Sequence, residues 1–245
     1  MVKTILETEK MIVLQAQLGD WDNLNHLLVC KNTNTAVIVD PFFSDYWLEV
    51  CQNNNWELSQ VWLTHSHWDH AKGVDGLSDR QVWVHSFEAE RGWDGPSNNE
   101  WHHQANSYVL HTIGELQFEV HCTPGHTPGH VTFIGEGVVI SGDCMFLGSC
   151  GRTDLFGGDV NAQKNSLLYL RERLQQVPDQ WYVLPGHQYA LSDGNNPTYI
   201  TVEKLLLQNE ALLALDNDED WEELGFLAFD DNMAEMARRE RAKHS

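Results

Sequence analysis

Residues 64–70 read T-H-S-H-W-D-H and place three histidines and one aspartate within seven positions. A folded core has no need of such a cluster, because His and Asp side chains are costly to bury without partners. Imidazole and carboxylate groups are, however, good ligands for zinc and iron. His65 and His67 are two residues apart, so their side chains would point the same way from the end of a strand. The spacing therefore favours a metal site over a packing role.

Three more candidate ligands follow apolar strands and sit in glycine-containing turns. They are His126 in C-T-P-G-H-T-P-G-H, Asp143 in V-V-I-S-G-D-C and His187 in Y-V-L-P-G-H-Q-Y. Each alone would usually be an ordinary turn residue, but together with the cluster they favour one shared site. Glycine before each ligand lets the backbone turn sharply and leaves room for close approach. Five histidines and two aspartates suit one or two cations such as zinc or iron.

The elements that must position these residues alternate between strands and helices. Apolar runs rich in β-branched residues predict strands over 10–18, 26–30, 35–39, 61–63 and 81–85. Further strands are expected within 107–121 and 131–141 and at 181–184. We expect one helix to begin at Ser44, another at Ala71, and a third to cover 161–174 with an apolar stripe. This order predicts an α/β fold with helices packed outside a pair of sheets.

The character of the chain changes near residues 190–198, where A-L-S-D-G-N-N-P-T is a credible linker. We therefore expect a metal-binding domain over 1–190 and a helical C-terminal extension over 191–245. Residues 199–215 have a helical period, and residues 216–235 carry nine acids. The basic residues crowded at 238–243 are interpreted as a solvated helix end rather than a binding surface.

The composition of the chain indicates which classes of partner and which cellular compartment are expected. The 245 residues carry a net charge of −21, which argues against nucleic-acid phosphates or an anionic membrane as the main partner. The five cysteines are odd in number and lack CxxC spacing, so a disulfide framework is not expected and a reducing cytoplasm fits. The N-terminus does not read as a signal peptide, and no apolar run reaches the roughly 18 residues of a membrane span. A cytoplasmic location is expected.

The motif T-H-S-H-W-D-H, followed by P-G-H, G-D and a second P-G-H, resembles the metallo-β-lactamase superfamily from residue 11 to about residue 190. The resemblance implies an αββα sandwich with the metal site at one edge of the two sheets. It also implies two metals, one held by His65, His67 and His126, the other by Asp69, His70 and His187, with Asp143 bridging. Asp40, in V-I-V-D-P, is similar to the aspartate that orients a ligand histidine in this family.

The spacing of the predicted ligands and one further stretch of sequence indicate which members of the superfamily the chain resembles. The intervals of 56 residues from His70 to His126 and 44 from Asp143 to His187 leave no room for the inserted domain of nucleic-acid-processing members. The stretch S-C-G-R-T-D-L-F-G-G-D at 149–159 resembles type II glyoxalases, the hydroxyacylglutathione hydrolases, and the related persulfide dioxygenases.

Two residues are expected to bind substrate on the strength of the same resemblance. In the glyoxalases a basic residue at the place of Arg152 and a tyrosine at the place of Tyr189 contact glutathione. The alternative for Arg152 is an internal salt bridge to Asp154 or Asp159.

The resemblance thus implies a thioester hydrolase of hydroxyacylglutathione type with two divalent ions, most simply zinc, with iron or manganese as alternatives. Metal-bound hydroxide would attack the carbonyl of a small, glutathione-linked thioester, while Asp69 ligates a metal and steers the nucleophile. A mono-iron persulfide dioxygenase is the first alternative, because both branches can show G-R-T-D. A non-catalytic module with a structural metal is the second, although structural zinc is normally closed by four protein ligands.

Overall fold

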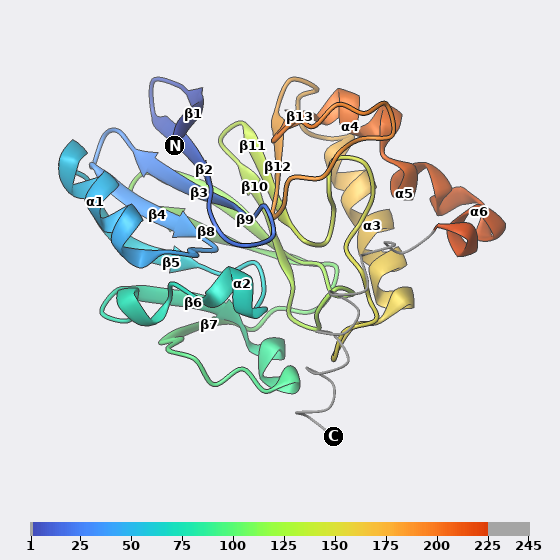
Figure 1. The fold of residues 1–245 in the computed structure, drawn as a ribbon, viewed down its shortest axis with the longest axis horizontal. Helices are drawn as coiled ribbons and strands as arrows, with labels where there is room; N and C mark the ends of the chain where they lie inside the picture. The colour runs from blue at the N-terminus through green and yellow to red at the C-terminus, as the bar shows by residue number, and fades with distance from the viewer. Residues whose placement is uncertain (1, 225–245) are drawn as a thin grey trace.

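A computed structural model describes residues 2–224, in which two β-sheets pack face to face (Figure 1). The seven-stranded sheet keeps its strands in chain order: β1 (Lys3–Glu7), β2 (Met11–Gln17), β3 (Leu24–Cys30), β4 (Thr35–Val39), β5 (Glu57–Trp62), β6 (Gln81–His85) and β7 (Asn99–Trp101). The six-stranded sheet has the order β13 (Ile200–Thr201), β12 (Tyr182–Pro185), β11 (Val138–Gly142), β10 (Val131–Gly135), β9 (Leu116–Cys122) and β8 (Tyr108–Ile113).

Helices cover the outer face of each sheet (Figure 1). The seven-stranded sheet packs against α1 (Ser44–Asn54) and η1 (Asp75–Leu77). The six-stranded sheet packs against α3 (Val160–Leu174), α4 (Val202–Gln208), α5 (Glu210–Leu213) and α6 (Asp218–Glu223). Three short elements complete this part of the chain: α2 (Trp68–Ala71), η2 (Ser86–Arg91) and η3 (Ala214–Asp216).

Alternating side chains along the strands build these layers. On β3, Leu28 and Cys30 enter the core between the sheets, whereas Leu27 and Val29 enter the core under α1. Strands buried on both faces read as continuous apolar runs, which is why they are easily found in the sequence. The αββα sandwich predicted above is confirmed.

Some local predictions are wrong. The helix expected to begin at Ala71 instead ends there, so Asp69 and His70 lie inside the one-turn helix α2. The backbone N–H of Gly73 donates to the carbonyl oxygen of Pro41 at 2.8 Å and not to the preceding turn, and glycine is a poor helix former, so the helix does not continue past this point. Strands β1 and β7 lie at the edges of their sheet and were not anticipated, because they are short and largely exposed.

The described part of the C-terminal extension packs on the six-stranded sheet. Its strand β13 pairs with β12, and Leu205 and Trp221 join the apolar core under α3. The boundary after residue 190 stays a prediction, and the basic run at 238–243 lies outside the described residues. Within residues 2–224, every helix is too short or too polar to cross a membrane.

Candidate metal centre

All seven predicted metal ligands meet at one edge of the two sheets. They come from five segments: His65 and His67 follow β5, Asp69 and His70 lie in α2, His126 follows β9, Asp143 follows β11, and His187 follows β12. Each is at most 8% exposed. Polar side chains at this depth require partners or a bound ion, because an unsatisfied buried polar group is costly.

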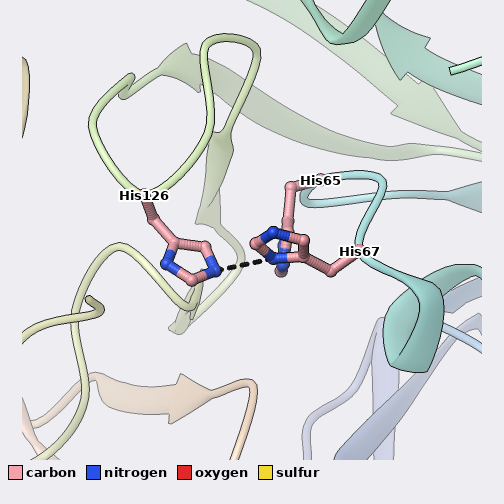
Figure 2. Close-up of side chains that lie close together, drawn as sticks. All are labelled: His65, His67 and His126. Atoms are coloured by element: carbon pink, nitrogen blue, oxygen red, sulfur yellow. Dashed lines mark hydrogen bonds between the residues drawn. The ribbon is translucent and has the colours of Figure 1, made fainter. Parts of the chain in front are cut away.

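His65, His67 and His126 form the first set (Figure 2). Their donor nitrogens lie within 4.8 Å of one another, and Nε2 of His126 is 2.9 Å from Nδ1 of His67. Nε2 of His65 and Nε2 of His67 are buried and have no hydrogen-bond partner among the described residues. Buried nitrogens without partners are rare in folded proteins, so this arrangement fits a cation bound between the three rings.

Asp69, His70 and His187 form the second set, again with donor atoms within 4.8 Å of one another. Nε2 of His187 lies 3.3 Å from Oδ2 of Asp69 and 3.1 Å from Nε2 of His70. Two imidazoles and one carboxylate converge here in a donor set that suits a divalent cation.

Asp143 lies between the two sets. Its Oδ1 is 3.4 Å from Nε2 of His70, and its Oδ2 is 3.6 Å from Nε2 of His126 and 3.3 Å from Nε2 of His187. The carboxylate therefore faces histidines of both sets, as a bridging ligand must. The His and Asp clusters fit a dinuclear site, and the ligand role of each residue stays a prediction.

The outward-facing nitrogens of two histidines are held by backbone carbonyls. Nδ1 of His126 lies 2.6 Å from the carbonyl oxygen of Arg152, and Nδ1 of His187 lies 2.7 Å from that of Trp21. A carbonyl oxygen can only accept, so Nδ1 carries the proton in each ring and donates it. Nε2 faces the centre, and once it carries no proton it offers its lone pair there, which is the tautomer a metal needs.

Asp40 lies where the sequence predicts an orienting carboxylate. Its Oδ2 is 2.9 Å from Nδ1 of His70, and it accepts hydrogen bonds from the backbone N–H and the hydroxyl of Thr64 at 2.8 and 2.6 Å. The Thr64 hydroxyl is in turn 3.0 Å from Nδ1 of His65. One carboxylate thus connects to a histidine of each set, which fits the orienting role predicted for it.

Charge inside the centre is unevenly distributed. Burial, reinforced by the neighbouring histidines, holds the pKa of His65 and of His67 well below the usual range, so both rings are neutral. Burial also opposes the charged form of His187, but Asp143 and Asp69 outweigh it and raise the pKa to about 10. Burial would raise the pKa of Asp69, yet His70 and His187 lower it to about 2, so this carboxylate is ionised at neutral pH.

Two glycines allow the ligand turns to form. Gly142, directly before Asp143, has a φ of 49°, in the left-handed region that side chains disfavour. A Cβ placed on Gly186, directly before His187, would come within 2.2 Å of Oδ1 of Asp143. Larger residues at these two positions would distort the centre, which agrees with the role assigned to glycine from the sequence.

Glu88 is a buried residue near the centre that sequence reasoning missed. Its side chain is inaccessible to solvent and accepts hydrogen bonds from the backbone N–H and hydroxyl of Ser66 and, at 2.8 Å, from the N–H of Gly129. It therefore ties the loop that carries the first two histidines to the loop that carries His126. No spacing signal marks Glu88 in the sequence, since it belongs to η2, a separate element.

His130 and Asn23 were also missed. Nε2 of His130 accepts hydrogen bonds from the backbone N–H groups of Asp143 and Cys144, both at 3.1 Å. Nδ2 of Asn23 donates to Oδ2 of Asp69 at 2.8 Å. The second histidine of P-G-H-T-P-G-H was an available signal for His130, whereas Asn23 lies 46 residues before Asp69 and carries no such signal.

The predicted substrate contacts lie beside the centre. The guanidinium of Arg152 donates to both carboxylate oxygens of Asp154, at 2.5 and 2.6 Å, which is one of the internal pairings considered above. The ring of Tyr189 stacks on that of His187, with centroids 5.6 Å apart and planes at 12°. Binding of substrate by Arg152 and Tyr189 stays a prediction.

Comparisons with known proteins agree with this geometry. A family model described as Metallo-beta-lactamase superfamily matches residues 19–187. Over 189 residues the chain is 33% identical to a hydroxyacylglutathione hydrolase of Pseudomonas fluorescens (strain SBW25), covering 75% of this chain and 68% of the relative.

Two solved structures extend the comparison to the fold. ETHE1 from Myxococcus xanthus has a TM-score of 0.71 at 24% identity, over 89% of this chain and 93% of that one, which shows a shared fold. A protein named TTHA1623, crystallised in a di-iron-bound form, has a TM-score of 0.61 at 27% identity, over 80% of this chain and 98% of that one.

Proposed function

The chain belongs to the metallo-β-lactamase superfamily, and from this premise we propose that it is a metal-dependent thioester hydrolase of hydroxyacylglutathione hydrolase type. The observation that carries the proposal is the pair of buried ligand sets on either side of Asp143. The 33% identical relative that is named hydroxyacylglutathione hydrolase supports a glutathione thioester as the substrate class.

Two divalent ions fit the centre, one in each set, and the seven side chains described above would hold them. Zinc is the proposed metal because imidazole and carboxylate ligands suit it, and the di-iron-bound relative makes iron the next candidate. When bound, such ions lower the pKa of water toward about 7 and stabilise negative charge on a carbonyl oxygen.

The chain's own residues prepare the reaction. Asp69 is ionised at neutral pH, and Asn23 holds its Oδ2 in place, so this carboxylate can accept a hydrogen bond from the attacking water and orient it. The leaving thiolate needs no strong acid, because thiols have a pKa of about 8.5. Cys144 is no candidate nucleophile, since burial raises the pKa of its thiol far above the usual range.

The alternatives make different demands on the same residues. A mono-iron persulfide dioxygenase would hold one iron, whereas the proposed hydrolase would use both ligand sets, so the number of ions per chain separates the two. The coordination sphere of a structural metal would be filled by four protein ligands.

The cytoplasmic location also stays a proposal, supported by five cysteines that are all free thiols.

Hydrolysis of S-D-lactoylglutathione by the purified protein tests the proposal. We expect turnover that a chelator abolishes and that added zinc or iron restores. His126→Ala should abolish the same activity because it removes one ligand of the first set. Absence of thioester hydrolysis in the metal-restored protein would contradict the proposed function.

A further inference from the structure

Aromatic side chains border the metal centre, and two of them, Phe43 and Trp68, are exposed. Trp68 lies between the predicted ligands His67 and Asp69, and its side chain is 50% exposed. Its ring packs edge-to-face on Trp21 at 5.2 Å and on Phe42 at 5.7 Å. Trp21 is also the residue whose carbonyl accepts from His187. The aromatic rim, defined as Trp21, Phe42, Phe43 and Trp68, is therefore attached directly to the loops that form the centre.

Lys72 extends over this rim. Its Nζ lies 4.2 Å from the ring centroid of Phe42, 5.0 Å from that of Trp68 and 5.4 Å from that of Phe43. The faces of aromatic rings attract a cation, so the three rings hold the ammonium group in one place. Lys72 itself is exposed, which leaves ammonium hydrogens available to a ligand.

Within residues 2–224, no ion pair neutralises the charge on Lys72. Among the described residues, no carboxylate forms an ion pair with Lys72, whereas Arg152, Arg171 and Arg173 are each paired with an acid. In a chain of net charge −21, a cation with no ion pair among the described residues attracts anions locally. Arg152, which the sequence suggested for this task, shares its charge with Asp154.

The most exposed predicted ligand, Asp69, lies next to the rim. Asp69 is 8% exposed, followed by His67 and Asp143 at 6% each, while His65 and His70 are at 0% and 1%. Asp69 and His67 are the two residues that flank Trp68 in the chain. A substrate that reaches the centre from this side passes the aromatic rim and Lys72.

We infer that Lys72 forms the anion-binding edge of the substrate site and contacts a carboxylate of the thiol carrier, while Trp68 packs on the apolar stem of that carrier. The inference rests on the proposed thioester hydrolase function. On this inference, α2 supplies metal ligands, and Lys72, which directly follows α2, selects a thioester that carries a carboxylate.

The test compares Lys72→Met, which keeps an apolar stem against the rings, with Lys72→Arg, which keeps the charge. Lys10→Met is the matched control, because it removes the same charge from an exposed lysine at the opposite end of β2 from Trp21. Binding of S-benzylglutathione, a thioether that cannot be hydrolysed, is measured by calorimetry for each metal-loaded protein. We expect Lys72→Met to weaken this binding about 2- to 5-fold, the size of an exposed ion pair, and Lys72→Arg and Lys10→Met to bind like the original chain.

Hydrolysis supplies the second readout. The measured quantity is the ratio of the KM for S-D-lactoylglutathione to the KM for the uncharged S-lactoyl-N-acetylcysteamine. This ratio should be higher in Lys72→Met than in the original chain, and in Lys72→Arg it should equal that of the original chain. If the original chain and Lys72→Met bound S-benzylglutathione equally, or if neither bound it, the inference about Lys72 would be overturned. Thioester hydrolysis in that case would still support the proposed function. Binding that depends on Lys72 in a protein that hydrolyses neither thioester would uphold the anion site and reject the proposed function.

Discussion

At the residue scale, the two-metal account depends most on Asp143, because its carboxylate faces histidines of both ligand sets. Asp143→Asn removes the negative charge and offers only one good acceptor oxygen to two cations. We expect loss of at least one metal per chain. Thioester turnover should fall by more than roughly 100-fold, which is the upper end of the loss seen when a residue that hydrogen-bonds a metal ligand is removed. Metal analysis and turnover of the purified variant check this.

Asp193→Asn is the control for that variant, since Asp193 lies exposed in the loop after β12. It should keep the metal content and turnover of the original chain. An Asp143→Asn protein that still held two metals and turned over normally would remove the bridging role.

The pKa of His187 predicts how metal affinity depends on pH. Because Asp143 and Asp69 raise it to about 10, the metal-free ring holds a proton at neutral pH. Asp143, Asp69 and Asp40 also raise the pKa of His70, in the same set, well above its usual range. Each such proton must leave before its nitrogen binds a metal, so the apparent metal affinity should rise at least about tenfold per pH unit from about pH 6.5 to about pH 8.5. Competition with a chelator of known affinity at each pH measures the slope. An affinity that is flat over this range would contradict the assignment of His187 as a ligand.

At the element scale, the loop between β5 and α2 and the loop after β9 must keep their relative positions. Glu88 connects them through three hydrogen bonds, in all of which it is the acceptor. Glu88→Gln replaces one acceptor oxygen with an NH2 group that faces a donor, so at least one bond is lost. We expect metal affinity to fall about 10-fold or more, as it does when a residue that supports a metal ligand by hydrogen bonding is removed. Titration of the folded, metal-free variant with zinc measures this.

Glu90→Gln is the matched control, because Glu90 lies in the same element η2 but is exposed. It should leave zinc affinity unchanged. If Glu88→Gln lowered only thermal stability and bound zinc like the original chain, Glu88 would be a core residue without a positioning role.

The sequence alone could locate the predicted ligands, since each follows an apolar strand and most sit in a recognisable turn. It could not reveal Glu88 or Asn23, because their partners come from distant segments that only the folded chain brings together. The helix was misplaced at Ala71 for a related reason: α2 spans four residues, too few for helical periodicity to be visible.

At the scale of the whole molecule, the described C-terminal helices are part of the core around the six-stranded sheet. Leu205 is fully buried there, whereas Leu207 on the same helix is 73% exposed. Leu205→Ala should lower the free energy of unfolding by about 2–5 kcal/mol. Leu207→Ala should change it by less than about 0.5 kcal/mol. Urea denaturation of both variants measures the difference, and equal losses would contradict this packing.

The layered fold was predictable because buried strands leave long apolar runs and because the ligand motif resembles one family. The arrangement of the rim was not, since Phe42 and Lys72 are 30 residues apart in the sequence and only the folded chain places the ammonium over the ring. The internal pairing of Arg152 with Asp154 was one of two interpretations of the same stretch, and side-chain geometry was needed to find it.

Metal stoichiometry measured together with oxygen uptake tests the central claim most directly. The protein is purified with its native metal, the ions per chain are counted, and S-D-lactoylglutathione and glutathione persulfide are offered in separate oxygen-electrode experiments. The two-metal hydrolase predicts about two ions per chain and thioester hydrolysis without oxygen consumption. A single iron per chain, with oxygen consumed on addition of the persulfide and no thioester hydrolysis, would contradict it.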